Sequence, residues 1–87
     1  MVSQSVVVRN LTGLHLRPAG ILCREALRFQ SKITFFCHDS ESNAKSVLSV
    51  LSSGVKGGDE IRLVCEGTDE TEALDALVKA IESGLGE

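Results

Sequence analysis

The chain has 87 residues, of which 43% are hydrophobic, and a formal net charge of −3 at neutral pH. This length and composition predict one globular domain, residues 1–87, and exclude a disordered chain. The acidic balance argues against nucleic acid as a main partner, and the lack of an apolar stretch of about 18 residues argues against membrane insertion.

The first half of the chain predicts a strand, a helix and a second strand. Residues 3–9 are rich in valine, and their alternation places Val6 and Val8 on one face. Residues 32–37, KITFFC, also have the pattern of a half-buried strand. Between them, from Leu16 to about Phe29, apolar residues recur at helical spacing and form a core stripe: Ala19, Leu22, Cys23 and Ala26.

The second half predicts a short strand at about 40–44, a helix over 46–53, a strand over 60–66 and a last helix at about 70–83. Ser46 is a favoured N-cap, and Asp69 and Glu72 have the spacing of a capping box. The order β-α-β-β-α-β-α is typical of an α+β fold in which helices pack on one face of a single sheet. The three widely spaced cysteines are expected to be reduced core residues in the cytoplasm, and no signal peptide is visible.

The stretch GLHLRPAG, residues 13–20, places His15 and Arg17 at the start of the first predicted helix, with Pro18 in its first turn. The unpaired N–H groups and the dipole of a helix start bind anions, above all phosphate. This positive potential and Arg17 disfavour a protonated imidazole, so His15 is expected to be neutral and nucleophilic. Attack on a phosphoryl donor would give a phosphohistidine. The alternative is that His15 is an ordinary surface residue and Arg17 a solvated charge.

The segment G-L-H-x-R-P-A closely resembles the active-site signature of the histidine-containing phosphocarrier (HPr) family of the bacterial sugar phosphotransferase system. The resemblance spans essentially the whole chain and includes N-A-K-S at 43–46. It implies an open-faced β-sandwich, with one four-stranded antiparallel sheet and three helices on one face. It also implies a carrier without a cofactor rather than a turnover enzyme. In the family, enzyme I, charged by phosphoenolpyruvate, phosphorylates Nδ1 of the histidine, and enzyme IIA domains accept the phosphate.

Carried over to this chain, the resemblance implies that His15 is the phosphoacceptor, that Arg17 clamps the phosphate and that Pro18 sets the helix start. Leu16 departs from the family, whose members commonly have a smaller or more polar residue there. Ser46 matches a serine that an ATP-dependent HPr kinase/phosphorylase modifies in some relatives, although a plain helix cap is the simpler interpretation. A family branch with glutamine in place of the histidine is only regulatory, and His15 argues against that branch.

Further residues are predicted to dock partner proteins. One face of the first helix combines cations with an apolar residue, and the helix after Ser46 has more apolar residues than so short an element can bury. The predicted docking residues are Leu16, Gly20, Ile21, Arg24, Val47, Leu48 and Leu51, with Arg17 and Arg28 extending the basic stripe. Such a stripe on an acidic protein favours an acidic partner.

Other sites and functions are weighed against this hypothesis. Cys37 and His38 are adjacent on a predicted strand and would point to opposite faces, so no metal site is expected. One alternative function is a primarily regulatory protein that a catabolite-control transcription factor recognises through phosphorylated Ser46. Another is a small-ligand domain in which His15 binds an anion without a covalent bond.

Overall fold

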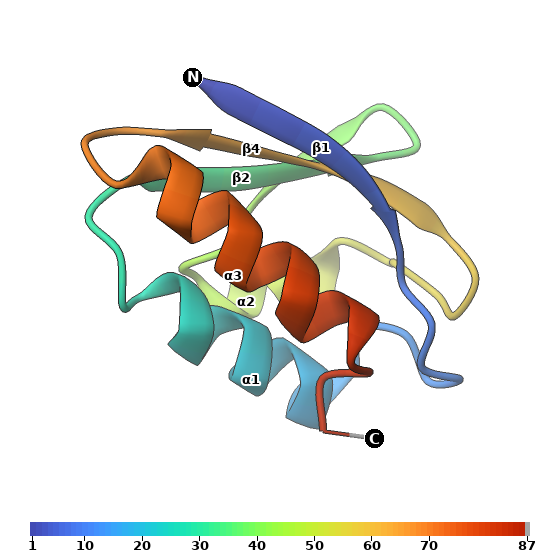
Figure 1. The fold of residues 1–87 in the computed structure, drawn as a ribbon. Coiled ribbons are helices and arrows are strands. Elements are labelled where there is room, and N and C mark those ends of the chain that lie inside the picture. The colour runs from blue at the N-terminus through green and yellow to red at the C-terminus, as the bar shows by residue number, and fades with distance from the viewer. Residues whose placement is uncertain (87) are drawn as a thin grey trace.

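The computed structural model describes residues 1–86 and consists of one antiparallel sheet covered on one face by three helices (Figure 1). The strands lie in the order β1-β4-β2-β3, so β1 and β3 form the edges. Both the predicted element order and the open-faced arrangement are confirmed. The elements are β1 (Val2–Val7), α1 (Leu16–Ala26), β2 (Lys32–Cys37), β3 (Ser40–Asn43), α2 (Val47–Ser52), β4 (Glu60–Glu66) and α3 (Glu70–Glu82).

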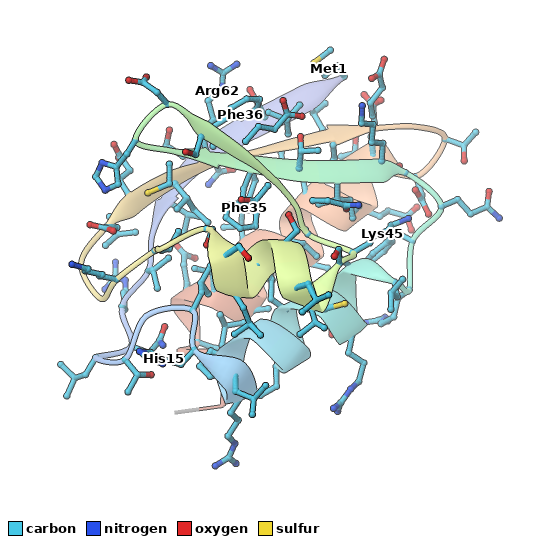
Figure 2. All side chains as sticks on the ribbon, turned by 180° about the vertical axis from the view of Figure 1, so that it is seen from behind. Met1, His15, Phe35, Phe36, Lys45 and Arg62 are labelled. Carbon is cyan, nitrogen blue, oxygen red and sulfur yellow. The ribbon has the colours of Figure 1, made fainter. Side chains whose placement is uncertain are left out.

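The core lies between the sheet and the helices, and alternation along the strands decides which side chains enter it. Phe35 is fully buried, whereas its neighbour Phe36 is 38% exposed. Figure 2 shows Phe35 on the helix side of β2, with Phe36 and Arg62 on the open side. Val6 and Val8 are both buried, as their spacing predicts. The sheet therefore presents one apolar face to the helices and one mixed face to solvent.

The helices are held by apolar stripes at helical spacing. The buried residues of α1 are Pro18, Ala19, Leu22 and Ala26, and those of α3 are Ala73, Leu77, Val78 and Ile81. Cys23, predicted to lie in the core stripe, is only half-buried, and its thiol donates to the carbonyl of Lys45 at 3.2 Å. Within residues 1–86 no helix has both the length and the apolar character needed to cross a membrane.

The first helix is shorter than predicted. It ends at Ala26, with Leu27 as the C-cap, because the N–H groups of Arg28 and Phe29 bond carbonyls three residues back. Such bonds tighten the chain beyond an α-helix. Arg28 therefore lies outside α1, where it pairs with Glu25.

The predicted capping box before α3 is wrong. Asp69 is the N-cap residue, but its side chain makes no capping hydrogen bond. Its carboxylate instead accepts hydrogen bonds from the N–H groups of Gln30 (2.8 Å) and Ser31 (2.9 Å) and from the Ser31 hydroxyl. The bond from the Ser31 side chain is the main reason why the pKa of Asp69 is lowered. This residue joins the start of α3 to the loop between α1 and β2.

Candidate functional site

His15 is the N-cap residue of α1. Its backbone is extended (φ −75°, ψ −174°), and its carbonyl accepts the first helical hydrogen bond from the Ala19 N–H at 2.7 Å. The imidazole makes no capping hydrogen bond and is exposed. Figure 2 shows His15 where the chain enters α1. The ring is therefore accessible to another molecule.

The loop before His15 is held against a second turn far along the chain. The Leu14 N–H donates to the Val55 carbonyl at 3.1 Å. Two hydrogen bonds between Asn10 and Gly13 close the loop: the Gly13 N–H donates to the Asn10 carbonyl, and the Asn10 side-chain amide donates to the Gly13 carbonyl. Gly13 has φ +67°, and a Cβ there would lie 2.4 Å from the Val55 oxygen and 2.7 Å from Lys56 Cα. Only glycine satisfies both the left-handed backbone and this close approach.

A depression of about 210 Å³ opens beside His15. It is formed where the His15 loop, the end of α2 and the turn after α2 meet, and its lining residues are Thr12, Leu14, His15, Leu51, Gly54, Val55 and Lys56. Lys56, which the sequence analysis missed, lines this depression together with His15. Its position follows from the pairing of two distant loops, and the only signal in the sequence is the Gly57–Gly58 pair that permits a tight turn.

Arg17 and Pro18 occupy the first turn of α1. Arg17 is exposed on the helix and does not line the depression, whereas Lys56 lines it from the turn after α2. Pro18 is buried in the first turn, as predicted, and has no N–H to leave unpaired. The N–H groups of Leu16 and Arg17 have no helical carbonyl to bond. His15 therefore lies at the positive end of a helix, with an exposed arginine in the first turn and a lysine among the residues of the adjoining depression.

Four of the five apolar residues predicted to dock partners are exposed. Leu16 and Leu48 are each 72% exposed, and Val47 and Leu51 are each 37% exposed. We call these four residues the candidate docking face. Leu51 lines the depression beside His15, and α2 packs against α1. The candidate docking face therefore adjoins the imidazole.

Ile21, also predicted to dock partners, is less accessible than these four residues. It is half-buried and packs against the core, and a Cβ on Gly86 would lie 2.6 Å from its Cδ1. The C-terminal segment returns beside the first turns of α1 (Figure 1), and its contact at Gly86 partly covers the Ile21 side chain. Gly20 and Arg24 remain accessible, and a Cβ on Gly20 would meet nothing within 4 Å. With Arg28 beyond the helix, the basic stripe on α1 is reduced to Arg17 and Arg24.

Comparison with known proteins agrees with this geometry. A family model described as "PTS HPr component phosphorylation site" matches residues 2–83. The chain belongs to the HPr family. It is 42% identical over 82 residues to the HPr-like protein Crh of Halalkalibacterium halodurans, covering 94% of this chain and 98% of the relative. It is 38% identical to the phosphocarrier protein HPr of Treponema pallidum, covering 100% and 99%.

A solved structure extends this agreement to the fold. The crystal structure of HPr-C-His from Thermoanaerobacter tengcongensis matches with a TM-score of 0.96 and 41% identity, covering 100% of this chain and 98% of that one. Together these relatives support a phosphocarrier of the phosphotransferase system.

Ser46 is the N-cap of α2, as predicted. Its Oγ accepts a hydrogen bond from the Ser49 N–H at 3.2 Å, and the residue is half-buried. The chain leading to it is fixed by further bonds: the Lys45 N–H donates to Asn43 Oδ1 at 2.9 Å, and Lys45 Nζ donates to the Phe29 carbonyl at 2.7 Å. In this HPr-family chain Ser46 therefore has a structural role whether or not it is modified.

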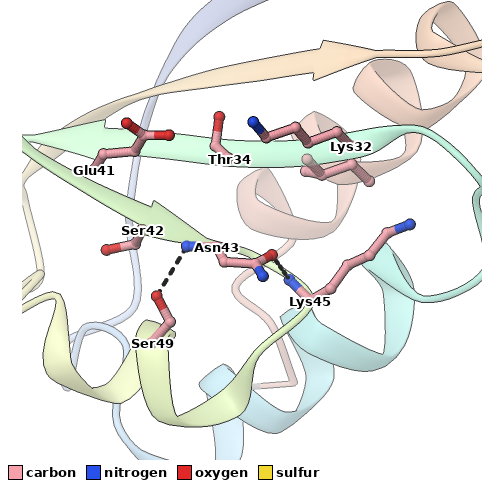
Figure 3. Close-up of a pocket in the computed structure, with 8 residues that line it drawn as sticks. Lys32, Thr34, Glu41, Ser42, Asn43, Lys45 and Ser49 are labelled. Atoms are coloured by element: carbon pink, nitrogen blue, oxygen red, sulfur yellow. Dashed lines mark hydrogen bonds between the residues drawn. The ribbon is translucent and has the colours of Figure 1, made fainter.

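A larger depression, of about 470 Å³, lies beside β2, β3 and the segment leading into α2 (Figure 3). Its lining is mainly polar: Lys32, Ile33, Thr34, Glu41, Ser42, Asn43, Lys45 and Ser49. Several of these groups bond one another, and the Asn43 N–H donates to Ser49 Oγ at 2.8 Å. The depression lacks a nucleophilic histidine or cysteine, so its size alone does not make it the reactive site.

The prediction that Cys37 and His38 point to opposite faces is wrong. The strand ends at Cys37, and His38 and Asp39 form a turn with φ 51° and 68°. This left-handed backbone redirects the imidazole toward Asp59, whose Oδ2 lies 3.4 Å from His38 Nε2. Side-chain donor atoms of Cys37, His38 and Asp59 all lie within 4.8 Å of one another.

Proposed function

We propose that this protein accepts a phosphoryl group from enzyme I on His15 and passes it to enzyme IIA domains. The observation that carries the proposal is the exposed imidazole at the N-cap of α1, beside a depression lined by Lys56. An imidazole lone pair attacks phosphorus, and the bond to the donor breaks with its electron pair staying on the donor. The reverse sequence passes the group to the next acceptor.

Arg17 and Lys56 would stabilise the transferred group. The phosphoryl oxygens carry negative charge through the transfer, and preorganised cations and N–H groups stabilise such charge. Arg17 can bond two oxygens at once through its planar guanidinium, whereas Lys56 supplies a point charge. The site is open because a carrier presents the same histidine to several proteins.

The candidate docking face supports the choice of proteins as partners. Four exposed apolar side chains lie on α1 and α2, one of them lining the depression beside His15, and contiguous exposed apolar surface marks an interaction site. Arg17 and Arg24 add positive charge to the adjoining helix. Electrostatic attraction of this kind raises association rates and weakens with salt. Enzyme I and enzyme IIA are therefore expected to present an apolar patch with acidic residues.

The direct experiment is incubation with phosphoenolpyruvate and enzyme I, followed by intact mass measurement. The parent should gain one phosphoryl group that is labile to acid, and His15→Ala should gain none while remaining folded. The matched control is His38→Asn, which removes the other histidine of the chain and should be phosphorylated like the parent. Acid-labile phosphorylation of the His15→Ala variant would reject the assignment.

The contribution of Arg17 is tested separately. Arg17→Lys keeps the charge but loses the planar fork, so transfer should slow in a stopped-flow assay. Because Arg17 is exposed, stability should change by less than about 0.5 kcal/mol. An unchanged transfer rate would show that the guanidinium is not the clamp.

A second candidate function is regulation through Ser46, with an HPr kinase/phosphorylase as modifier and a catabolite-control transcription factor as reader. The similarity to Crh proteins and the position of Ser46 at the start of α2, which carries three residues of the candidate docking face, favour it. Incubation with such a kinase and ATP should add one acid-stable phosphoryl group to the parent and none to Ser46→Ala. No gain in the parent would leave Ser46 as a helix cap alone.

A further inference from the structure

The turn between β2 and β3 brings three metal-binding residue types together on the sheet side of the molecule. Cys37 is the last residue of β2, His38 follows in the left-handed turn, and Asp59 directly precedes β4. Among residues 1–86 they form the one group of at least three His, Cys, Asp or Glu whose donor atoms lie within 4.8 Å of one another. None of the three lines the depression beside His15.

The distances are close to those of a metal centre. In tetrahedral zinc sites the metal–sulfur distance is about 2.3 Å and the metal–nitrogen and metal–oxygen distances are about 2.0–2.2 Å, so neighbouring ligand atoms lie roughly 3.3–3.6 Å apart. His38 Nε2 and Asp59 Oδ2 are already 3.4 Å apart. The three donor atoms lie within 4.8 Å of one another, so binding requires the His38 side chain, which is 74% exposed, to move closer to the buried thiol of Cys37.

The donor set also selects the metal. A sulfur, an imidazole nitrogen and a carboxylate oxygen suit Zn²⁺, whereas Mg²⁺ and Ca²⁺ prefer oxygen ligands alone. Asp59 is held in place by the Lys56 N–H, which donates to Oδ2 at 2.9 Å. Partners of this kind orient the ligands of known metal sites.

We propose that Cys37, His38 and Asp59 bind one Zn²⁺ ion, with water completing a four-coordinate site. On binding, the Cys37 S–H bond breaks, its proton passes to solvent, and the sulfur bonds to the metal in place of a bound water. Desolvation by burial, with the charge of Asp59, raises the pKa of the Cys37 thiol. A dication next to the sulfur opposes both effects.

Zinc at this position would tie the β2–β3 turn to the segment that supports the His15 loop. The Asp59 carbonyl accepts from the Val8 N–H at 2.9 Å, and the Gly58 N–H donates to the Val8 carbonyl at 2.7 Å. Binding to the folded state should therefore raise the melting temperature in proportion to the logarithm of free Zn²⁺. A chelator should reverse this effect.

The test uses the full chain, kept reduced with a phosphine that does not compete for zinc. Equilibrium dialysis should show saturable binding of one Zn²⁺ per chain, and Co²⁺ should give the near-ultraviolet charge-transfer absorption of a thiolate ligand. Sedimentation should show that the loaded protein remains monomeric. A lack of saturable binding, a Co²⁺ spectrum without that absorption, or zinc held only between two chains would overturn the proposal.

Variants identify the ligands. His38→Asn is decisive, because asparagine tolerates the left-handed backbone and the position is exposed, so the fold should be kept. Loss of a direct ligand should weaken Zn²⁺ binding at least about 100-fold, the upper end of the effect of removing an outer partner. Cys37→Ser should also abolish the Co²⁺ absorption. Cys23→Ser and His15→Ala, the matched controls, should bind like the parent. Unchanged binding by His38→Asn would overturn the site.

Discussion

Gly13 is expected to be the residue whose replacement by alanine most directly dislodges the His15 loop. Its φ of +67° costs an alanine roughly 1–2 kcal/mol. Its new Cβ would also lie 2.4 Å from the Val55 oxygen and 2.7 Å from Lys56 Cα, both backbone atoms that cannot rotate away. Forced overpacking adds typically about 1–3 kcal/mol. The Gly13→Ala variant should therefore lose about 2–5 kcal/mol of unfolding free energy.

Gly54→Ala is the matched control for this prediction. Gly54 has nearly the same φ, +72°, but a Cβ there would meet nothing within 4 Å, so only the backbone cost of roughly 1–2 kcal/mol should appear. Each kcal/mol shifts the melting temperature of a chain of this size by about 4–8 °C. Circular dichroism is the suitable probe, because the chain has no Trp or Tyr. Equal losses in the two variants would refute the close approach of the two loops.

Three further predictions concern the surface and the loops around the site. Ser46→Asp should fold at least as well as the parent, because aspartate is an equally good N-cap; at low salt its initial rate of His15 phosphorylation should fall, and a normal rate would rule out electrostatic interference. Gly20→Ala should add about 0.5–1 kcal/mol to the unfolding free energy, since alanine favours a helix over glycine and its Cβ would enter open space. Unchanged stability in urea titrations would contradict this expectation. Slower phosphoryl transfer despite the gain in stability would identify Gly20 as a docking residue. The pKa of Asp69 is lowered, first by the hydrogen bond from Ser31, so its ionised form stabilises the fold at pH values above the unfolded-state pKa of about 4. This stability is lost as the pH falls through the folded-state pKa. In an acid titration the unfolding free energy of Asp69→Asn should decline less steeply than that of the parent, and parallel profiles would contradict this role.

The sequence predicted most of the fold because its local signals agree with its long-range contacts. Alternation assigned Val6 and Val8 to the core, and the helical stripe of α1 gave three of its four buried residues correctly as Ala19, Leu22 and Ala26. His15 was correctly placed at a helix start, since Gly13 and Pro18 punctuate the chain there. Periodicity and turn residues are the signals that single sequences preserve best.

Three of the differences between expectation and structure have a common physical cause. Ile21 is covered by the C-terminal segment, Asp69 bonds a loop that precedes β2, and Lys56 lines the same depression as His15 because two loops meet. Each depends on a neighbour distant in sequence, which propensity and spacing do not encode. The prediction for His38 was wrong for a different reason. A left-handed backbone at a residue other than glycine is uncommon, so the alternation of strand residues was extended one residue too far, from Cys37 to His38.

The support of the His15 loop by Val55 and Lys56 also sets an order of events during synthesis. A ribosome makes His15 early, but the turn that holds its loop and the strand that pairs with β1 are made in the second half of the chain. A nascent chain that has exposed GLHLRPAG therefore still lacks the surface on which this segment rests. Under the proposed function, competence to receive phosphate requires the second half of the chain, so truncated products of interrupted translation should not draw phosphate from the pool of charged donors.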